Sequence, residues 1–320
     1  MGNNEINEIA VGALAGALDR TNEELRSQRR STYIRLALKG LFFLIVTLLV
    51  VNAGKNGLNN KSAGNKFEAH VAEIDITGPI MDGQSASADK IILSVQNAYE
   101  SPNVKAVVLR INSPGGSPVQ AGIVFDELLS LKDKHKDIPL YAVIDDLGAS
   151  AAYYIAASAD KIYVDKASMV GSIGVISSGF GYTDLMQKLG VERRLYTSGA
   201  NKGLLDPYSP VNDGIKTHWN AMLGDIHQQF ISSVKKGRGE RLAKDNPDLF
   251  SGLIWTGEKS KELGLSDEIG NMLTVSRFVL AGKINIVNYT EKPDLMSQLS
   301  RKASAEFHGA MINLTAPYLQ

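Results

Sequence analysis

The chain of 320 residues contains no cysteine, which excludes disulfides, thiolate catalysis and cysteine-based metal sites. It also has no excess of either charge, because lysine plus arginine and aspartate plus glutamate both total 34. We therefore expect no general attraction to nucleic acid. The chain lacks an HExxH pair of histidines, so neither a metal nor another cofactor is expected. With 44% hydrophobic and 21% charged residues, its composition is that of a folded protein.

One long apolar run stands apart from this composition. Residues 36–54 predict a transmembrane helix, because about 20 apolar residues span the hydrocarbon core of a bilayer. Several basic residues precede the run, and Lys39 near its start can extend its ammonium to the headgroups. The positive-inside tendency places residues 1–35 in the cytoplasm and the rest of the chain outside the inner or plasma membrane. The sequence thus predicts a single-pass signal anchor, with a buried core helix as the alternative.

The remainder of the chain divides by composition. Residues 55–68 are rich in glycine, asparagine, lysine and serine, as is typical of a linker. Residues 69–290 alternate short β-branched runs with helical periods, which predicts an α/β domain. Residues 291–320 form a C-terminal tail of mixed polarity to which we assign no function.

The expected elements follow from the same periodicities. Strands are predicted at VAEIDI, VKAVVLRI, LYAVID, KIYVD, VGSIGVI and RRLYTS. Helices are predicted over residues 88–99, 119–132, 183–189 and 212–236, with a short one near Ser150. The apolar stripe of the 212–236 helix indicates a packing or oligomer face.

Two glycine-rich or alanine-rich segments follow predicted strands. NSPGGSP spans 112–118, and DDLGASAAYY spans 145–154. Such strand-to-helix turns gather at the carboxyl ends of parallel strands, where ligand sites collect. Glycines in the first segment let the backbone approach a substrate closely and direct an amide toward a developing oxyanion. A tight turn with an N-cap serine explains the same residues.

Ser150 is the candidate nucleophile in the second segment. It opens an alanine-rich helix, whose dipole and first free amide favour a nearby negative charge. An N-cap role explains Ser150 equally well in isolation. A catalytic serine needs a base, and no histidine lies between Ser150 and Thr217. His218 and His227 lie in the long predicted helix and are interpreted as surface or packing residues, so a Ser–His–Asp triad stays open but unsupported.

A lysine whose pKa is lowered by burial is the other base available. Lys202 follows a predicted strand and a glycine-containing turn, and Leu204 and Leu205 come directly after it. Any single lysine is most simply a solvated surface residue, so this assignment depends on the wider pattern.

Five segments in order resemble the signal peptide peptidase A family, whose catalytic domain is similar to Clp protease and crotonase domains. They are LRINSPGGSPVQAG, GASAAYYIAASADKIYVD, MVGSIGVI, YTSGANKGLLDPYSP and WTGEKSKELGLSDEIG. The resemblance covers roughly residues 71–270 and implies repeated β-β-α units. It places the catalytic nucleophile on Ser150 and the general base on Lys202, with a separation that resembles the short, single-repeat members.

The resemblance also implies the rest of the site. Ser172 would orient the lysine, and the amides of Gly116 and Ala151 would form the oxyanion hole. Many members carry two glycines after the nucleophile, where this chain has two alanines, so substrate access is expected to differ. The implied reaction is acyl transfer to water, with activity rising toward alkaline pH.

The implied substrates are membrane-associated peptides, especially remnant signal peptides. The implied assembly is a homo-oligomer in which serine and lysine come from neighbouring subunits. Two alternatives remain open at this point. One is a catalytically inactive relative that binds peptides or scaffolds a membrane complex, and the other is a crotonase-like acyl-CoA enzyme.

Overall fold

The computed structural model describes residues 38–41, 44 and 64–291. The chain separates into two compact units, Met1–Ser62 and Ala63–Gln320. Most of the predicted transmembrane segment, residues 36–54, lies outside the described residues, as do residues 1–35 and the tail from residue 292 onward. Among the residues that are described, no helix is both long and apolar enough to cross a bilayer.

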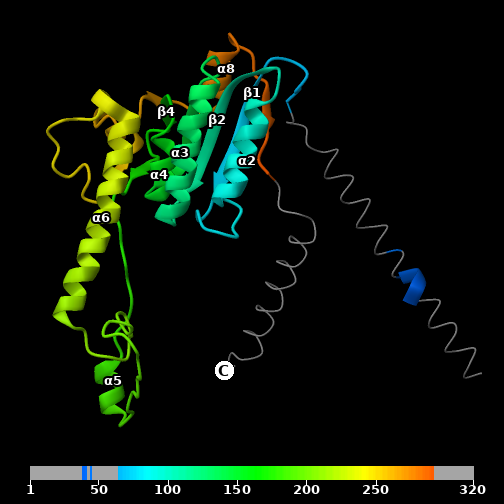
Figure 1. Ribbon diagram of the computed structural model, residues 1–320. Helices are drawn as coiled ribbons and strands as arrows, with labels where there is room; N and C mark the ends of the chain where they lie inside the picture. Colours follow the sequence, from blue (N-terminus) through cyan, green and yellow to red (C-terminus); the bar gives the residue numbers. More distant parts are fainter. Residues whose placement is uncertain (1–37, 42–43, 45–63, 292–320) are drawn as a thin grey trace, which may run out of the picture. The chain divides into compact units, whose positions relative to one another are not determined.

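The second unit is built on one mostly parallel sheet (Figure 1). Its main path runs β6-β5-β3-β2-β1-β8, and β4 pairs with both β3 and β7. Only the β5–β6 pair is antiparallel among the described ladders. The strands are β1 (His70–Thr77), β2 (Val104–Ser113), β3 (Leu140–Ala149), β4 (Lys161–Val164), β5 (Met169–Gly171), β6 (Ile254–Thr256), β7 (Glu268–Ile269) and β8 (Ile286–Asn288).

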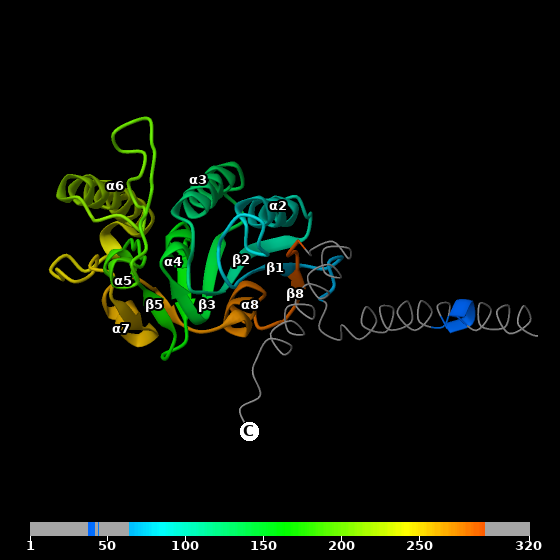
Figure 2. The same cartoon turned by 90° about the horizontal axis from the view of Figure 1, so that it is seen from below.

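Helices cover both faces of the central strands (Figure 2). The helices α2, α3 and α4 pack on one face, and α8 packs on the other. The helices are α2 (Ala88–Tyr99), α3 (Pro118–Lys134), α4 (Ala151–Ala156), α5 (Thr183–Lys188), α6 (Asp213–Arg238), α7 (Gly257–Glu262) and α8 (Met272–Val279), with a 3₁₀ turn at Gly239–Arg241.

The central strand β2 is apolar on both sides because both of its faces are covered. Val107 and Leu109 point into the core beneath α2 and α3, whereas Ala106 and Val108 belong to the core beneath α8. This double coverage fixes the carboxyl ends of β2 and β3 rigidly, and both glycine-rich or alanine-rich turns leave the sheet from these two ends.

The structure confirms the predicted α/β class and differs in detail. The first three strands alternate with single helices, so the order strand-strand-helix occurs only at β4, β5 and α5. The predicted strand at 193–198 is wrong, because these residues form irregular, exposed backbone with no strand to pair with. Contacts to the domain begin inside the predicted linker, where the Gly64 amide donates to the Ile286 carbonyl at 2.9 Å.

A long segment between β5 and the second half of α6 buries almost nothing. Residues 174–229, here called the arm, contain no buried side chain. They include α5, which Figure 1 places at the end of the arm away from the sheet, and the first half of α6. Large apolar side chains are exposed on the arm, among them Ile176 (87%), Phe180 (79%) and Tyr196 (89%). The chain by itself therefore leaves an extensive apolar surface in contact with solvent.

Candidate active site

Ser150 occupies a strained backbone conformation between β3 and α4. Its φ of 55° and ψ of −125° lie outside the regions that L-residues normally adopt. Such strain costs about 1–3 kcal/mol and persists where the surrounding structure enforces it. A serine on a sharp, strained strand-to-helix turn is the geometry of a nucleophile elbow, which presents the hydroxyl at the end of the sheet.

The N-cap interpretation of Ser150 is not supported, because its side chain forms no capping hydrogen bond with α4. Ser117 provides the contrast, since its hydroxyl accepts from the Gln120 amide and Pro118 follows it at the first helical position. The N-cap prediction for the NSPGGSP segment is thus confirmed at Ser117. The Ser150 hydroxyl forms no such capping hydrogen bond.

The two glycines of the first turn pack directly against this elbow. A Cβ on Gly115 would lie 2.7 Å from the Ser150 Cβ, and one on Gly116 would lie 2.2 Å from the Ile80 carbonyl oxygen. Both glycines also have positive φ, 99° and 155° respectively. Only glycine fits there without displacing the backbone, so the close approach of this turn to Ser150 depends on the missing side chains.

Two amide donors remain free beside the elbow. Within the described part of the chain, neither the Gly116 nor the Ala151 amide has a hydrogen-bond acceptor. Ile80 holds the turn from the other side, because its amide donates to the Gly115 carbonyl at 2.9 Å and its carbonyl accepts from the Ser117 amide at 2.8 Å. The arrangement leaves the Gly116 amide unused while fixing its neighbours.

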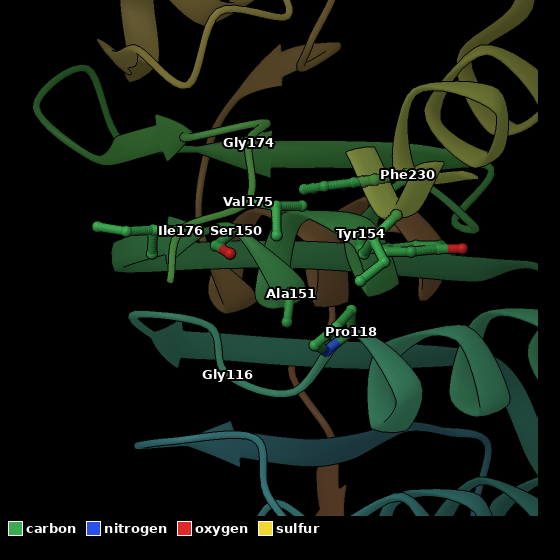
Figure 3. Close-up of a pocket in the computed structure, with 10 residues that line it drawn as sticks. Gly116, Pro118, Ser150, Ala151, Tyr154, Gly174, Val175, Ile176 and Phe230 are labelled. Atoms are coloured by element: carbon green, nitrogen blue, oxygen red, sulfur yellow. The ribbon is translucent and has the colours of Figure 1, made fainter. Parts of the chain in front are cut away.

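A cavity of about 100 Å³ opens next to the Ser150 side chain (Figure 3). Figure 3 shows Ser150 with Val175 on one side, while Tyr154 and Phe230 lie together at the end of the cavity away from Ile176. The rings of Tyr154 and Phe230 stack with centroids 4.8 Å apart. The full lining is Gly116, Pro118, Ser150, Ala151, Tyr154, Gly174, Val175, Ile176, Ile226 and Phe230.

Several of these lining residues were not recognised as site residues in the sequence. Ile226 and Phe230 belong to the apolar stripe of the long helix, which the sequence analysis interprets as a packing or oligomer face. Their spacing of four residues places both on one helix face. The apolar helix face is therefore visible in the sequence, but nothing in the sequence indicates that this face closes the cavity beside Ser150.

The structure brings Ser150, Gly116 and Ala151 together and does not bring Lys202 to them. Lys202 lies on the arm with an exposed side chain, and it does not line the Ser150 cavity. Leu205, expected to help desolvate the lysine, is itself 55% exposed. The burial that the sequence analysis requires of a lysine base is thus absent from the described single chain.

Ser172 lies close to the elbow in space, although the two are distant in sequence, because β3 and β5 are neighbouring strands. The Ser150 amide donates to the carbonyl of Gly171 at 2.8 Å, and Ser172 follows with a positive φ of 50°. The Ser172 amide donates to the Leu253 carbonyl at 2.7 Å. Ser172 therefore sits at the edge of the site, at the point where the chain leaves β5 and enters the arm.

His227 is a further residue that the sequence analysis assigned to surface or packing. Its ring Nε2 lies 3.0 Å from the Ile173 carbonyl oxygen. Because a carbonyl only accepts, Nε2 carries the proton in this contact. The residue is thus linked to the backbone directly after Ser172, across 54 positions of sequence.

Comparison with known proteins identifies the family of this chain. Residues 132–280 match the model of Peptidase family S49. A putative protease of Synechocystis sp. is 31% identical over 200 residues, which cover 62% of this chain and 69% of that protein. The chain belongs to peptidase family S49. Ser150, Ser172 and Lys202 all fall within the matched segment of the S49 family, whereas Gly116 precedes it.

Other relatives support the S49 assignment and differ in length. A putative signal peptide peptidase SppA from Enterococcus faecium is 31% identical over 218 residues, covering 66% of this chain and 62% of that protein. A protein named Na(+)/H(+) antiporter NhaA from Brucella melitensis is 38% identical over 238 residues, covering 72% of this chain but 32% of that protein. The chain thus spans about a third of the length of the antiporter relative.

The antiporter name and the peptidase names describe different activities. The alignment to the antiporter relative covers 238 residues of this chain, so it must include part of the segment that matches the S49 model. The shared region is therefore at least partly the peptidase segment, and the family assignment does not depend on the name of the longer protein.

Proposed function

We propose that this chain is a membrane-anchored serine endopeptidase that uses a Ser–Lys dyad. Ser150 is the nucleophile, and the observation that carries this role is its strained elbow beside two free backbone amides. A hydroxyl held at such a turn, with no structural hydrogen bond of its own, is available to attack a peptide carbonyl.

The amides of Gly116 and Ala151 form the oxyanion hole in this proposal. Both donors are unpaired in the described chain and flank the cavity beside Ser150. Donors fixed in advance stabilise the developing negative charge without reorganising during the reaction. The dipole of α4 contributes little more, because the helix has only six residues.

Lys202 acts as the general base, and a neighbouring copy of the chain supplies it. Two observations support a shared site: Lys202 is exposed on the arm of the single chain, and the arm carries large apolar side chains that nothing in the described chain covers. Docking the arm on a second copy buries these side chains and removes the lysine from water. Ser172, at the root of the arm, then orients the lysine amine.

The proposed reaction proceeds by acyl transfer. Lys202 takes the Ser150 proton, the serine oxygen attacks the peptide carbonyl, and the two amides hold the oxyanion of the tetrahedral intermediate. The protonated lysine then delivers its proton to the leaving amine. Water, deprotonated by the lysine in turn, hydrolyses the acyl-enzyme and regenerates Ser150.

The substrates in this proposal are membrane-associated peptides, including signal-peptide remnants. The cavity beside Ser150 is small and lined mainly by apolar groups, so it accepts one apolar side chain of modest size. The predicted transmembrane segment at residues 36–54 would hold the domain next to such substrates, with residues 1–35 on the cytoplasmic side.

A peptide-binding relative without catalytic activity is the second candidate. The exposure of Lys202 in the single chain favours it, because the described chain does not supply the burial that a lysine base requires. The two candidates share the cavity and differ in whether a bound peptide is cut.

Peptide cleavage by the full chain in detergent separates these candidates. Wild type, Ser150→Ala and Lys202→Ala are compared on a fluorogenic apolar peptide and a synthetic signal peptide between pH 6 and 10. Lys188→Ala, on the same arm and also exposed, is the matched control. The peptidase proposal predicts wild-type activity that rises with pH, loss in both dyad variants, and retention in the control. Binding without cleavage by the assembled wild type would favour the second candidate.

A further inference from the structure

The wall of the Ser150 cavity is the first part of the arm. Gly174, Val175 and Ile176 line the cavity, and they come shortly after β5, which ends at Gly171. After Ile173, the next hydrogen bond in this described stretch is the one from the Tyr182 amide to the Pro207 carbonyl. The wall residues themselves therefore depend on the anchoring of the backbone just before them.

That backbone is fixed at three successive residues by three separate parts of the chain. The Gly171 carbonyl accepts from the Ser150 amide at 2.8 Å, and the Ser172 amide donates to the Leu253 carbonyl at 2.7 Å. The Ile173 carbonyl accepts from His227 on α6 at 3.0 Å. The third contact is the only one of the three made by a side chain, so it is the one that a substitution can remove.

His227 also joins this wall to the opposite side of the cavity. It is adjacent to Ile226 and one turn before Phe230, and both of these side chains line the cavity. His227 is half-buried, whereas His218 on the same helix is exposed. A single hydrogen bond thus ties the helix face that closes the cavity to the backbone that forms its wall.

We propose that His227 is a positioning residue that sets the shape of the cavity beside Ser150 and so determines which substrate side chain fits. The inference rests on the proposed peptidase function, in which this cavity receives the side chain next to the cleaved bond. Among the described residues, no hydrogen bond joins His227 to Ser150 or to the two free amides, so it acts through the Ile173 backbone. Loss of the His227–Ile173 hydrogen bond is expected to let the cavity wall at 174–176 move, while the strained turn at Ser150 keeps its conformation.

The test uses three variants of the full chain. His227→Ala removes the donor, His227→Gln keeps an amide N–H that can reach the carbonyl, and His227→Leu fills the space without a donor. His218→Ala is the control for loss of a histidine from α6. Each protein is measured on two peptides that differ only in carrying leucine or alanine at the residue before the cleaved bond.

The proposal predicts a change in selectivity. In His227→Ala and His227→Leu, kcat/KM for the leucine peptide divided by kcat/KM for the alanine peptide falls by about five- to tenfold. This is the factor expected for one lost hydrogen bond. KM for the leucine peptide accounts for the fall, and kcat for the alanine peptide stays near wild type. His227→Gln restores the ratio. An unchanged ratio in His227→Ala, or no better recovery in His227→Gln than in His227→Leu, overturns the proposal.

Exchange of the Ser172 amide, which donates to the Leu253 carbonyl next to the His227 contact, tests the positioning role without an activity measurement. This amide is expected to exchange faster in His227→Ala and His227→Leu than in wild type and His218→Ala, while β3 and α4 remain protected. Equal exchange in all variants contradicts the positioning role. A wild-type protein that cleaves neither peptide contradicts the proposed function instead, and the exchange result still tests His227.

Discussion

The amide of Ser150 donates a 2.8 Å hydrogen bond to the carbonyl of Gly171. This bond links the strained turn at the end of β3 to the end of β5, the neighbouring strand. Ser172 follows Gly171 directly, and the cavity wall begins at Gly174. The backbone of Ser150 is thus joined to the end of β5, from which the chain continues through Ser172 into the arm.

Replacing Gly116 by alanine is expected to abolish most activity. The new Cβ would lie 2.2 Å from the Ile80 carbonyl oxygen, and the φ of 155° is unfavourable for alanine. The turn must shift, and with it the free amide, so kcat is expected to fall by roughly 100-fold or more, as for loss of one oxyanion donor. Single-turnover peptide cleavage measures this change.

Gly122→Ala is the matched control for the glycine substitution. A Cβ there has an ordinary contact of 3.8 Å with the Tyr154 hydroxyl, and Gly122 lies within α3. Alanine in a helix interior is expected to stabilise the fold by up to about 1 kcal/mol. Equal loss of activity in both variants would argue against a special role for the Gly116 amide.

The buried ion pair of Arg238 and Asp267 is expected to stabilise the fold at neutral pH. Arg238 forms two hydrogen bonds to the Asp267 carboxylate, at 2.7 and 2.9 Å, and its side chain is fully buried. Asp267→Asn leaves this guanidinium unpaired and is expected to cost about 3–5 kcal/mol. Urea unfolding measures the loss, and Asp133→Asn, in an exposed pair with Lys136, is expected to change little.

The same pair makes stability depend on acid pH. Burial opposes ionisation of Asp267, but the hydrogen bonds and charge of Arg238 outweigh it and hold the pKa of this carboxyl below its usual value of 3.8. A lowered folded-state pKa gives stability that is present above the unfolded value and is lost as pH falls through the folded one. The difference between wild type and Asp267→Asn is therefore expected to shrink below about pH 4. A constant difference would contradict the pairing.

Loss of the hydroxyl is expected to change the stability of the fold differently at two buried tyrosines. The Tyr153 hydroxyl donates to the Leu265 carbonyl at 2.8 Å, whereas the Tyr99 hydroxyl is buried and has no partner among the described residues. Tyr153→Phe is expected to cost about 1–2 kcal/mol, and Tyr99→Phe to be neutral or slightly stabilising. Thermal unfolding of the two variants side by side tests this, and equal destabilisation would contradict it.

The sequence predicts the core elements well because their signals are local. Ala88–Tyr99 is helical over the predicted residues, since Ile91 and Val95 fall on one buried face. The long helix, predicted over 212–236, is observed at Asp213–Arg238. Its apolar stripe packs only from Phe230 onward, because the first half belongs to the arm, where the single chain offers nothing to pack against.

The failures have physical causes that a single sequence does not contain. Residues 193–198 have the composition of a strand, but no sheet edge reaches the arm, so they stay irregular. Gly115 packs closely against Ser150, and His227 contacts a carbonyl 54 positions away, so both relationships join distant parts of the sequence. Such long-range contacts determine the geometry of the site, whereas sequence periodicity predicts only the helices and strands from which the site residues come.

Mixing two inactive variants tests the central claim that the dyad forms between copies of this chain. Full-length Ser150→Ala and Lys202→Ala, carrying different tags, are assembled separately and together, and mixed assemblies are isolated through both tags. A site built from neighbouring subunits predicts recovery of about a quarter of wild-type activity in a random mixture, because one copy contributes the serine and its neighbour the lysine. Mixed assemblies that remain inactive, while wild type treated in the same way cleaves peptide, would contradict the account.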